Sequence, residues 1–250
     1  MSNVADIARE IDRRLPELAR DVIRSHLDVS VPENRSFLQS PDGREQHQTE
    51  WHQWGIITHT RRFLRDLETA VPGYLRSWGR WETVDARLQR PIDGATRWQL
   101  LEVTILLHDI GKFGARRRGR QRFHFGGHEV LSGEIIRSQL HLDRLGLTET
   151  QIEYIARTAE DHFVLGVVRK RAREQGAYDL GFVETSSFRE LALDIKDRHP
   201  EDFVEIGVLF LGDSLSKADP ESGPERAAGQ YGVNIAVARH YLEIVLDAGG

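Results

Sequence analysis

Apolar residues recur at steps of three and four along most of this 250-residue chain, and no stretch alternates apolar and polar residues over a useful length. The first run shows the pattern clearly, with Val4, Ile7, Ile11 and Leu15 on one helical face. This period is typical of amphipathic α-helices, whereas strands have a period of two. The same spacing predicts helices over 3–27, 47–67, 96–110, 128–145, 149–163, 187–198, 201–217 and 224–247. The chain is therefore predicted to be an all-α bundle.

Two polar segments interrupt the helical pattern. Residues 28–46 carry two prolines and a glycine among many polar side chains, which predicts a long ordered loop. Residues 112–126 are basic and contain glycines, which predicts a second loop. We expect one main domain at 47–220, preceded by an N-terminal helical extension at 1–46. A C-terminal helix at 221–250 is expected to pack on the same domain.

The composition excludes several kinds of chemistry. The chain has no cysteine, which rules out disulfides, thiolate metal sites and cysteine nucleophiles. Its net charge of −5 argues against a general nucleic-acid binder, so no stable nucleic-acid partner is expected. No apolar run approaches the roughly 18–20 residues that span a bilayer, so no membrane partner is expected. The acidic start lacks a signal core, and we expect a cytoplasmic protein.

The pair His108-Asp109 ends the apolar stretch LLEVTILLHDIGK. Ionisable residues at the end of a buried helix need a partner, because an unpaired buried charge is costly. A cation supplies one, since Asp offers charge, His offers a nitrogen ligand, and the helix C-terminus adds partial negative charge. The pair taken alone fits equally well with a capping His beside a solvated Asp.

Further candidate ligands occur in similar settings elsewhere in the chain. His52 and His59 lie seven residues apart, which places them near one face of the helix predicted over 47–67. His128 begins a predicted helix, His162 ends another, and Asp213 lies inside an apolar one. A buried carboxylate requires a metal or a strong donor. The combined set offers enough nitrogen and oxygen ligands for one or two octahedral cations, with water completing the shells.

The ordered set His59, His108-Asp109 and Asp213 resembles the HD-domain superfamily of metal-dependent phosphohydrolases. The segments EWHQWGIITHT and FHFGGHEVLSGEII are also similar to HD proteins, and the resemblance covers roughly residues 47–220. It implies a helical bundle with the metal site at its centre. The implied core ligands are His59, His108, Asp109 and Asp213. His128 and His162 fall where two-metal members carry additional histidines, which makes Asp109 the bridging carboxylate and a catalytic residue.

Differences from other HD proteins exclude several activities known in that superfamily. The roughly 46 residues before the HD region contain no strand-borne pair of aspartates, so a nucleotidyltransferase is not expected. The acidic pair of guanosine tetraphosphate hydrolases and the Gly-Tyr-Pro signature of cyclic-di-GMP phosphodiesterases are absent. The spacing from HDIGK to FGGHE does not fit the deoxynucleotide triphosphohydrolases. The resemblance thus implies a stand-alone HD protein.

Basic residues follow the HD pair directly. Lys112 and the run Arg116, Arg117 and Arg118 are interpreted as a phosphate clamp, with Lys112 as a catalytic point charge near the leaving group. A solvated basic loop explains the run equally well. His52 lies beside tryptophans that could stack a ring, so it is a candidate for substrate binding. The basic cluster at 169–173 is interpreted as solvated surface.

These features together predict a metal-dependent phosphohydrolase. It would cleave a phosphomonoester or phosphodiester of a phosphorylated small molecule or nucleotide through a metal-activated water. The ligand set suits one or two divalent ions and does not distinguish Mn, Mg, Co, Ni, Zn and Fe. One alternative is an HD-fold di-iron oxygenase that acts on a polyol or phosphonate. The other is a non-catalytic scaffold that senses a nucleotide. The sequence does not specify the oligomeric state.

Overall fold

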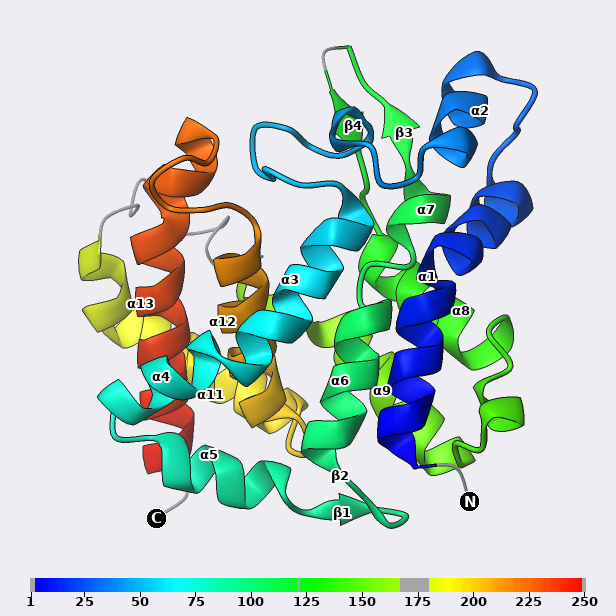
Figure 1. Cartoon of the computed structure of the whole chain (residues 1–250). Coiled ribbons are helices and arrows are strands. Elements are labelled where there is room, and N and C mark those ends of the chain that lie inside the picture. Colours follow the sequence, from blue (N-terminus) through cyan, green and yellow to red (C-terminus); the bar gives the residue numbers. More distant parts are fainter. Residues whose placement is uncertain (1–2, 121, 167–179, 249–250) are drawn as a thin grey trace.

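The computed structural model describes residues 3–120, 122–166 and 180–248, and it confirms the all-α fold (Figure 1). The basic cluster at 169–173 lies outside these residues. The helices are α1 (Val4–His26), α2 (Pro32–Gln39), α3 (Ile56–Glu68), α4 (Ala70–Ser77), α5 (Trp81–Leu88), α6 (Arg97–Leu107), α7 (Lys112–Ala115), α8 (His128–Ser138), α9 (Glu149–Asp161), α11 (Ser186–Arg198), α12 (Phe203–Ser216) and α13 (Glu225–Asp247). Short 3-10 turns are η1 (Arg44–Gln46), η2 (Leu142–Leu145) and η3 (Leu180–Glu184).

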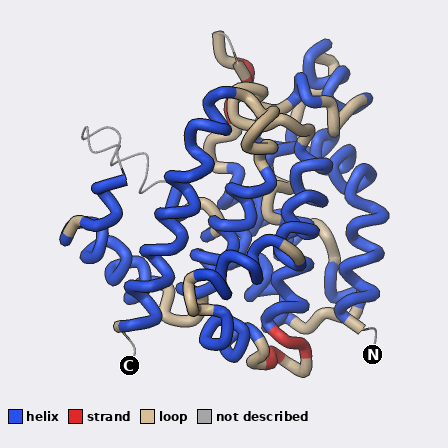
Figure 2. The backbone as a smooth tube through the Cα atoms, turned by 60° about the vertical axis from the view of Figure 1, so that its left-hand side comes forward, coloured by secondary structure: helices blue, strands red, loops and turns tan. Residues whose placement is uncertain are grey.

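Strands in the described residues are confined to two small antiparallel hairpins. One pairs β1 (Pro91–Ile92) with β2 (Ala95–Thr96), and the other pairs β3 (Arg117–Arg118) with β4 (Phe123–His124). They lie at opposite ends of the molecule (Figure 2). The second hairpin occupies much of the stretch that the sequence predicted as a loop over 112–126, after the single helical turn α7.

Two hydrophobic clusters form the core. The first lies among α1, α6, α8 and α9, and the second among α4, α5, α11, α12 and α13. The helices α3 and α6 contribute to both, because Ile57 and Leu107 belong to the first cluster while Phe63 and Ile105 belong to the second. These two helices thus lie between the clusters (Figure 1).

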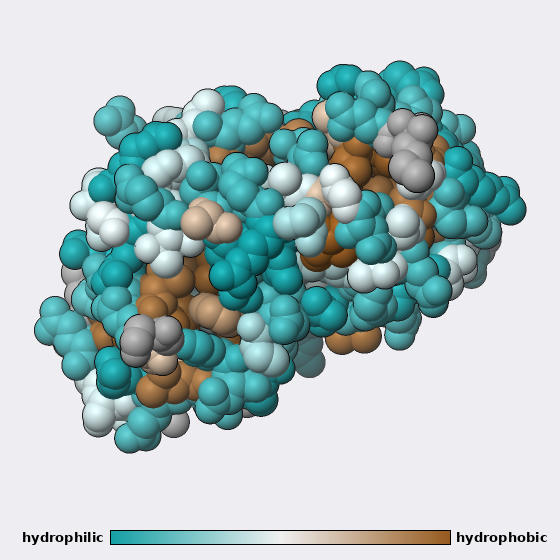
Figure 3. Space-filling view, turned by 90° about the horizontal axis from the view of Figure 1, so that it is seen from below, coloured by the Kyte–Doolittle hydropathy of each residue, from teal (hydrophilic) through white to brown (hydrophobic). Residues whose placement is uncertain are grey.

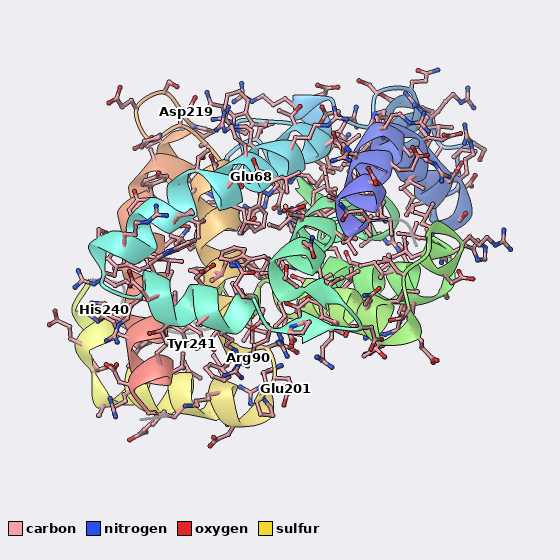
Figure 4. The ribbon with its side chains drawn as sticks, turned by 60° about the horizontal axis from the view of Figure 1, so that its bottom comes forward. Glu68, Arg90, Glu201, Asp219, His240 and Tyr241 are labelled. Atoms are coloured by element: carbon pink, nitrogen blue, oxygen red, sulfur yellow. The ribbon has the colours of Figure 1, made fainter. Side chains whose placement is uncertain are left out.

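The helix α12 is covered on all sides, since every residue from Val204 to Ser216 is buried. Its first turn carries Glu205, which pairs with Arg97 at 2.5 Å and accepts a hydrogen bond from Tyr154 at 3.1 Å. Glu201 and Asp219 lie just outside the two ends of this helix (Figure 4). A fully covered helix is fixed by packing around its whole circumference.

Residues outside the core present a largely polar surface. Seen from below, hydrophobic side chains show in separate areas bordered by hydrophilic ones (Figure 3). In the described part of the chain, the large hydrophobic side chains that remain exposed are Val31 and Val130. No described helix combines the length and the apolar character that crossing a bilayer needs.

The predicted helix over 47–67 is wrong in its first half, because α3 begins only at Ile56. Asp42 reaches from the preceding segment and binds the start of α3, accepting from the Thr58 N–H at 2.9 Å and from the Thr58 hydroxyl at 2.6 Å. Gly55 permits this approach, since a Cβ there would lie 1.9 Å from the Asp42 carbonyl oxygen. His52 therefore lies in a loop, not on one helical face with His59.

Two other predicted segments also have different boundaries in the structure. The segment 28–46, predicted as a loop, contains α2 and η1, and Pro32 is the first residue of α2, a position that proline tolerates. The helix predicted over 128–145 ends at Ser138, and η2 follows. His141 separates them in a left-handed conformation, with φ 49°, which a continuous α-helix excludes.

The turn that joins α6 to α7 packs tightly against α8. Ser132 fastens it there, because its Oγ accepts from the Gly111 N–H at 2.9 Å and donates to the His108 carbonyl at 2.7 Å. A Cβ at residue 111 would lie 2.2 Å from the His128 carbonyl oxygen and 2.6 Å from the Ser132 nitrogen. Only glycine allows the two backbones to approach this closely.

We expect Gly111→Ala to lower the free energy of unfolding by about 1–3 kcal/mol, because the added methyl group overpacks two backbones. Gly73→Ala is the matched control, since a Cβ at residue 73 meets nothing within 4 Å. This control sits on an exposed helical position and should be neutral or stabilising by up to about 1 kcal/mol. Urea unfolding in the presence of a chelator measures both. Equal unfolding free energies for the two variants would contradict the packing described for the turn.

Candidate metal centre

Six potential metal ligands from separate elements meet where the helix ends converge. They are His59 on α3, His108 and Asp109 in the turn after α6, His128 at the start of α8, His162 directly after α9, and Asp213 on α12. Apart from His128, whose side chain is 12% exposed, their side chains are at most 4% exposed. The residues predicted from sequence as ligands are thus brought together in one buried cluster.

Asp109 lies between two groups of histidines. Its Oδ2 is 3.3 Å from His108 Nε2 and 3.7 Å from His59 Nε2. Its Oδ1 is 3.2 Å from His128 Nε2 and 3.8 Å from His162 Nε2. Each group, together with Asp109, keeps one ligand atom per residue within 4.8 Å of the others. The two oxygens of one carboxylate therefore serve two adjacent ligand triads, which is the arrangement that a bridged pair of cations requires.

Backbone carbonyls fix the orientation of three of these rings. In His108, His128 and His162, Nδ1 lies 2.7, 2.8 and 2.6 Å from the carbonyl oxygen of the third residue before it. A carbonyl only accepts, so Nδ1 carries the proton and Nε2 keeps its lone pair. Such a bond is the usual support of a histidine that ligates a metal. All three free lone pairs belong to the atoms that face Asp109.

His59 is oriented by a hydroxyl group and a carboxylate. Ser216 Oγ donates to the Asp213 carbonyl at 2.9 Å and lies 3.2 Å from His59 Nδ1. His59 Nε2 is hydrogen-bonded to Asp213 Oδ1 at 3.1 Å and lies 3.7 Å from Asp109 Oδ2. These contacts direct Nε2 toward the two carboxylates.

Unsatisfied polar atoms also fit a bound cation. His108 Nε2 and Asp109 Oδ1 are buried and have no hydrogen-bond partner in the described part of the chain. Burial alone raises the pKa of a carboxyl group, but the neighbouring His108 and the Lys112 ammonium group hold the pKa of Asp109 well below its usual range. Burial lowers the pKa of His162 to about 3. The centre therefore presents an ionised carboxylate with neutral imidazole, a donor set that suits divalent metals.

A cavity of about 400 Å³ opens beside this cluster. His128, His162 and Asp213 form part of its wall, and two lysines border it. Lys112 donates to Asp109 Oδ2 at 2.7 Å, while Lys217 donates to Asp213 Oδ2. Further lining side chains are those of Trp51, His52, Phe163, Ser214 and Tyr231. A small molecule in this cavity would therefore contact part of the cluster, aromatic side chains and two lysines.

The arginine part of the predicted phosphate clamp lies elsewhere. Arg116 is 4% exposed, its guanidinium lies 4.3 Å from the Phe37 ring and 3.8 Å from the Phe123 ring, and it donates to Gln46. Arg117 and Arg118 are exposed on β3. All three arginines border a different cavity, between α1, α2 and the hairpin. Arg116 is held as a packing residue, and in this structure only Lys112 of the clamp borders the metal cavity.

His47 is a site residue that sequence reasoning missed. It is 2% exposed, and its ring stacks on His52 with 3.7 Å between centroids. Its Nε2 lies 3.2 Å from Lys112 Nζ. The sequence placed it at the start of the helix predicted over 47–67, whereas α3 begins only at Ile56. The one available indication was the density of histidines, since His47 and His52 lie in the same short segment.

We expect about two divalent metals per chain, falling towards one in His128→Ala or His162→Ala, because each change removes a ligand from one triad only. His124→Ala is the matched control, since His124 borders the same cavity but belongs to neither triad. Mass spectrometry of anaerobically purified protein gives the metal content. A content near two in His128→Ala and His162→Ala alike would contradict the second triad.

A comparison with protein families now bears on this geometry. The family model of the HD domain matches residues 52–204, more than half of the chain. This range contains every histidine of the two triads, whereas Asp213 lies beyond its end. No curated protein matches the chain. The chain belongs to the HD-domain family.

Proposed function

We propose that this protein is a metal-dependent phosphohydrolase that cleaves a phosphomonoester or phosphodiester of nucleotide size. The observation that carries the proposal is the position of Asp109, whose two oxygens face two ligand triads at the edge of a cavity bordered by lysines. Two cations about 4 Å apart are a recurrent arrangement in enzymes that displace groups at phosphorus. HD-domain membership is in keeping with this chemistry.

The chain's own residues would bind and orient the phosphate. Lys112 and Lys217 border the cavity beside the ligands and bring positive charge to the phosphate oxygens. Their ion pairs with Asp109 and Asp213 hold both ammonium groups close to the metal centre. When bound, divalent cations supply Lewis-acid chemistry, which activates water and stabilises charge on the phosphoryl oxygens. The buried setting of the ligands strengthens each of these electrostatic contacts.

The remaining wall suits an organic group that carries a ring. Trp51, Phe163 and Tyr231 supply aromatic surface, and His52 and Ser214 supply polar atoms. The cavity volume of about 400 Å³ lies within the range of roughly 300–1,000 Å³ that is typical of small-molecule sites. These features support a nucleotide or a phosphorylated small molecule as substrate.

A second candidate function rests on the same six ligands. Four histidines and two aspartates, with Asp109 between the triads, also form a donor set for two irons. The alternative is therefore an HD-fold di-iron oxygenase that acts on a polyol or phosphonate. Oxygen dependence separates the two reactions, because hydrolysis requires no redox change at the metal.

We expect metal-loaded protein to hydrolyse, under argon, at least one member of a panel of nucleoside monophosphates, cyclic nucleotides and sugar phosphates. Monoesters would release inorganic phosphate, and cyclic nucleotides would give a nucleoside monophosphate. Manganese, cobalt and magnesium are tested as added metals. Asp109→Asn should lower kcat/KM at least about a hundredfold, because the amide cannot supply the charge that holds two cations. Asp85→Asn is the matched control, since Asp85 lies on α5 and bonds Trp98.

The same panel distinguishes the rival functions. Oxygen uptake by the iron-loaded protein with a polyol or phosphonate, together with no anaerobic hydrolysis of any phosphoester, would assign the oxygenase. Nucleotide binding without turnover in either assay would assign a sensing scaffold. Equal hydrolysis rates for Asp109→Asn and the unmodified protein would overturn the proposed site.

A further inference from the structure

Lys112 is held by two acceptors at once. Its ammonium group donates to Asp109 Oδ2 at 2.7 Å and to His47 Nε2 at 3.2 Å. Its side chain is 7% exposed and borders the metal cavity. A lysine ammonium has three N–H groups arranged as a tripod. Two fixed acceptors stop its rotation and leave one N–H for a ligand.

His47 is itself fixed as an acceptor. Its Nδ1 lies 3.2 Å from the Trp54 carbonyl oxygen, which only accepts, so Nδ1 carries the proton. Its Nε2 therefore holds a lone pair, which is what an ammonium donor needs. The ring is further confined by stacking on His52 and by the edge of Phe125, whose centroid lies 5.8 Å away. Both bonds to His47 require the same tautomer.

The loop that carries His47 is tied to the far side of the centre. The Gln53 N–H donates to the Lys217 carbonyl at 2.9 Å, and the Asp219 N–H donates to Gln53 Oε1 at 2.8 Å. On its other side, Gln48 donates to the Phe123 carbonyl at 3.4 Å. These bonds hold the loop that carries His47 in place.

We propose that His47 is a positioning residue, which holds the Lys112 ammonium so that its third N–H binds a phosphate oxygen of the substrate. This inference rests on the proposed function. In the described part of the chain, the hydrogen-bond acceptors of this ammonium are His47 and Asp109, its nearer acceptor and the carboxylate shared by the two triads. Loss of His47 would therefore let the ammonium shift toward Asp109. His47 thus shares the lysine with Asp109 and keeps one donor directed at the ligand.

Two substitutions separate positioning from packing. His47→Phe keeps a flat ring but loses both hydrogen bonds, whereas the amide of His47→Gln has an acceptor and a donor. We expect His47→Phe to weaken the binding of inorganic phosphate to the metal-loaded protein about tenfold and to raise KM by a similar factor, with unchanged metal content. His47→Gln should recover most of the affinity. Calorimetry measures phosphate binding, and mass spectrometry measures the metal.

A double-mutant cycle tests the route through Lys112. In a Lys112→Met background, His47→Phe should have no further effect on phosphate affinity, because the group that it positions is gone. His240→Phe, on α13 and distant from the loop in Figure 4, is the matched control. A full additional loss in the Lys112→Met background would overturn the proposal. So would equal losses in His47→Gln and His47→Phe, or an absence of phosphate binding to the unmodified protein.

The double-mutant cycle and the hydrolysis assay can fail independently of each other. Coupling between His47 and Lys112 in phosphate binding, without hydrolysis of any phosphoester, would overturn the proposed function and leave the positioning role in place. Hydrolysis without coupling would overturn the positioning role alone.

Discussion

One buried negative charge organises the centre of this molecule. The Asp109 carboxylate is 2% exposed, and it lies within 3.8 Å of four imidazoles and within 2.7 Å of an ammonium group. Removing such a charge from water costs several kcal/mol, which only close opposite charges or a bound cation offset. Lys112 supplies one unit of charge, while the imidazole lone pairs supply none. That unit offsets the carboxylate, but Asp109 Oδ1 and His108 Nε2 still have no hydrogen-bond partner in the described part of the chain, and a bound cation would give them one.

The ligands reach Asp109 because several helices begin or end beside it. His108, His128 and His162 each lie at a helix end, where the carbonyl three residues earlier accepts the Nδ1 proton. A ring held by its own backbone needs no second side chain to orient it. Because no orienting side chains are needed for these rings, several ligands fit in a small volume. Gly111 and Ser132, which bind no cation, are needed for two of these ends to meet.

The periodicity of apolar residues predicted the fold class, and the context of ionisable residues predicted the ligands. His108 and Asp213 interrupt apolar helices, and that contrast is visible in the sequence. The loop before α3 was not predictable in this way, because its shape depends on Asp42, which is close in space but outside the helical pattern. His47 was missed for the same reason. The arginine run misled because charge along the sequence does not reveal that Arg116 lies between two phenyl rings.

The complete burial of α12 has a consequence for how this protein can change. A helix with one solvent-facing side can slide or rotate a little while its neighbours adjust, but α12 has no such side. The position of Asp213 therefore depends on how the whole second hydrophobic cluster packs around α12. Substitutions near Leu209, just over one helical turn before Asp213, would shift this ligand without touching it. Substitutions in this part of the core would therefore change the position of a candidate metal ligand although they lie outside the metal centre.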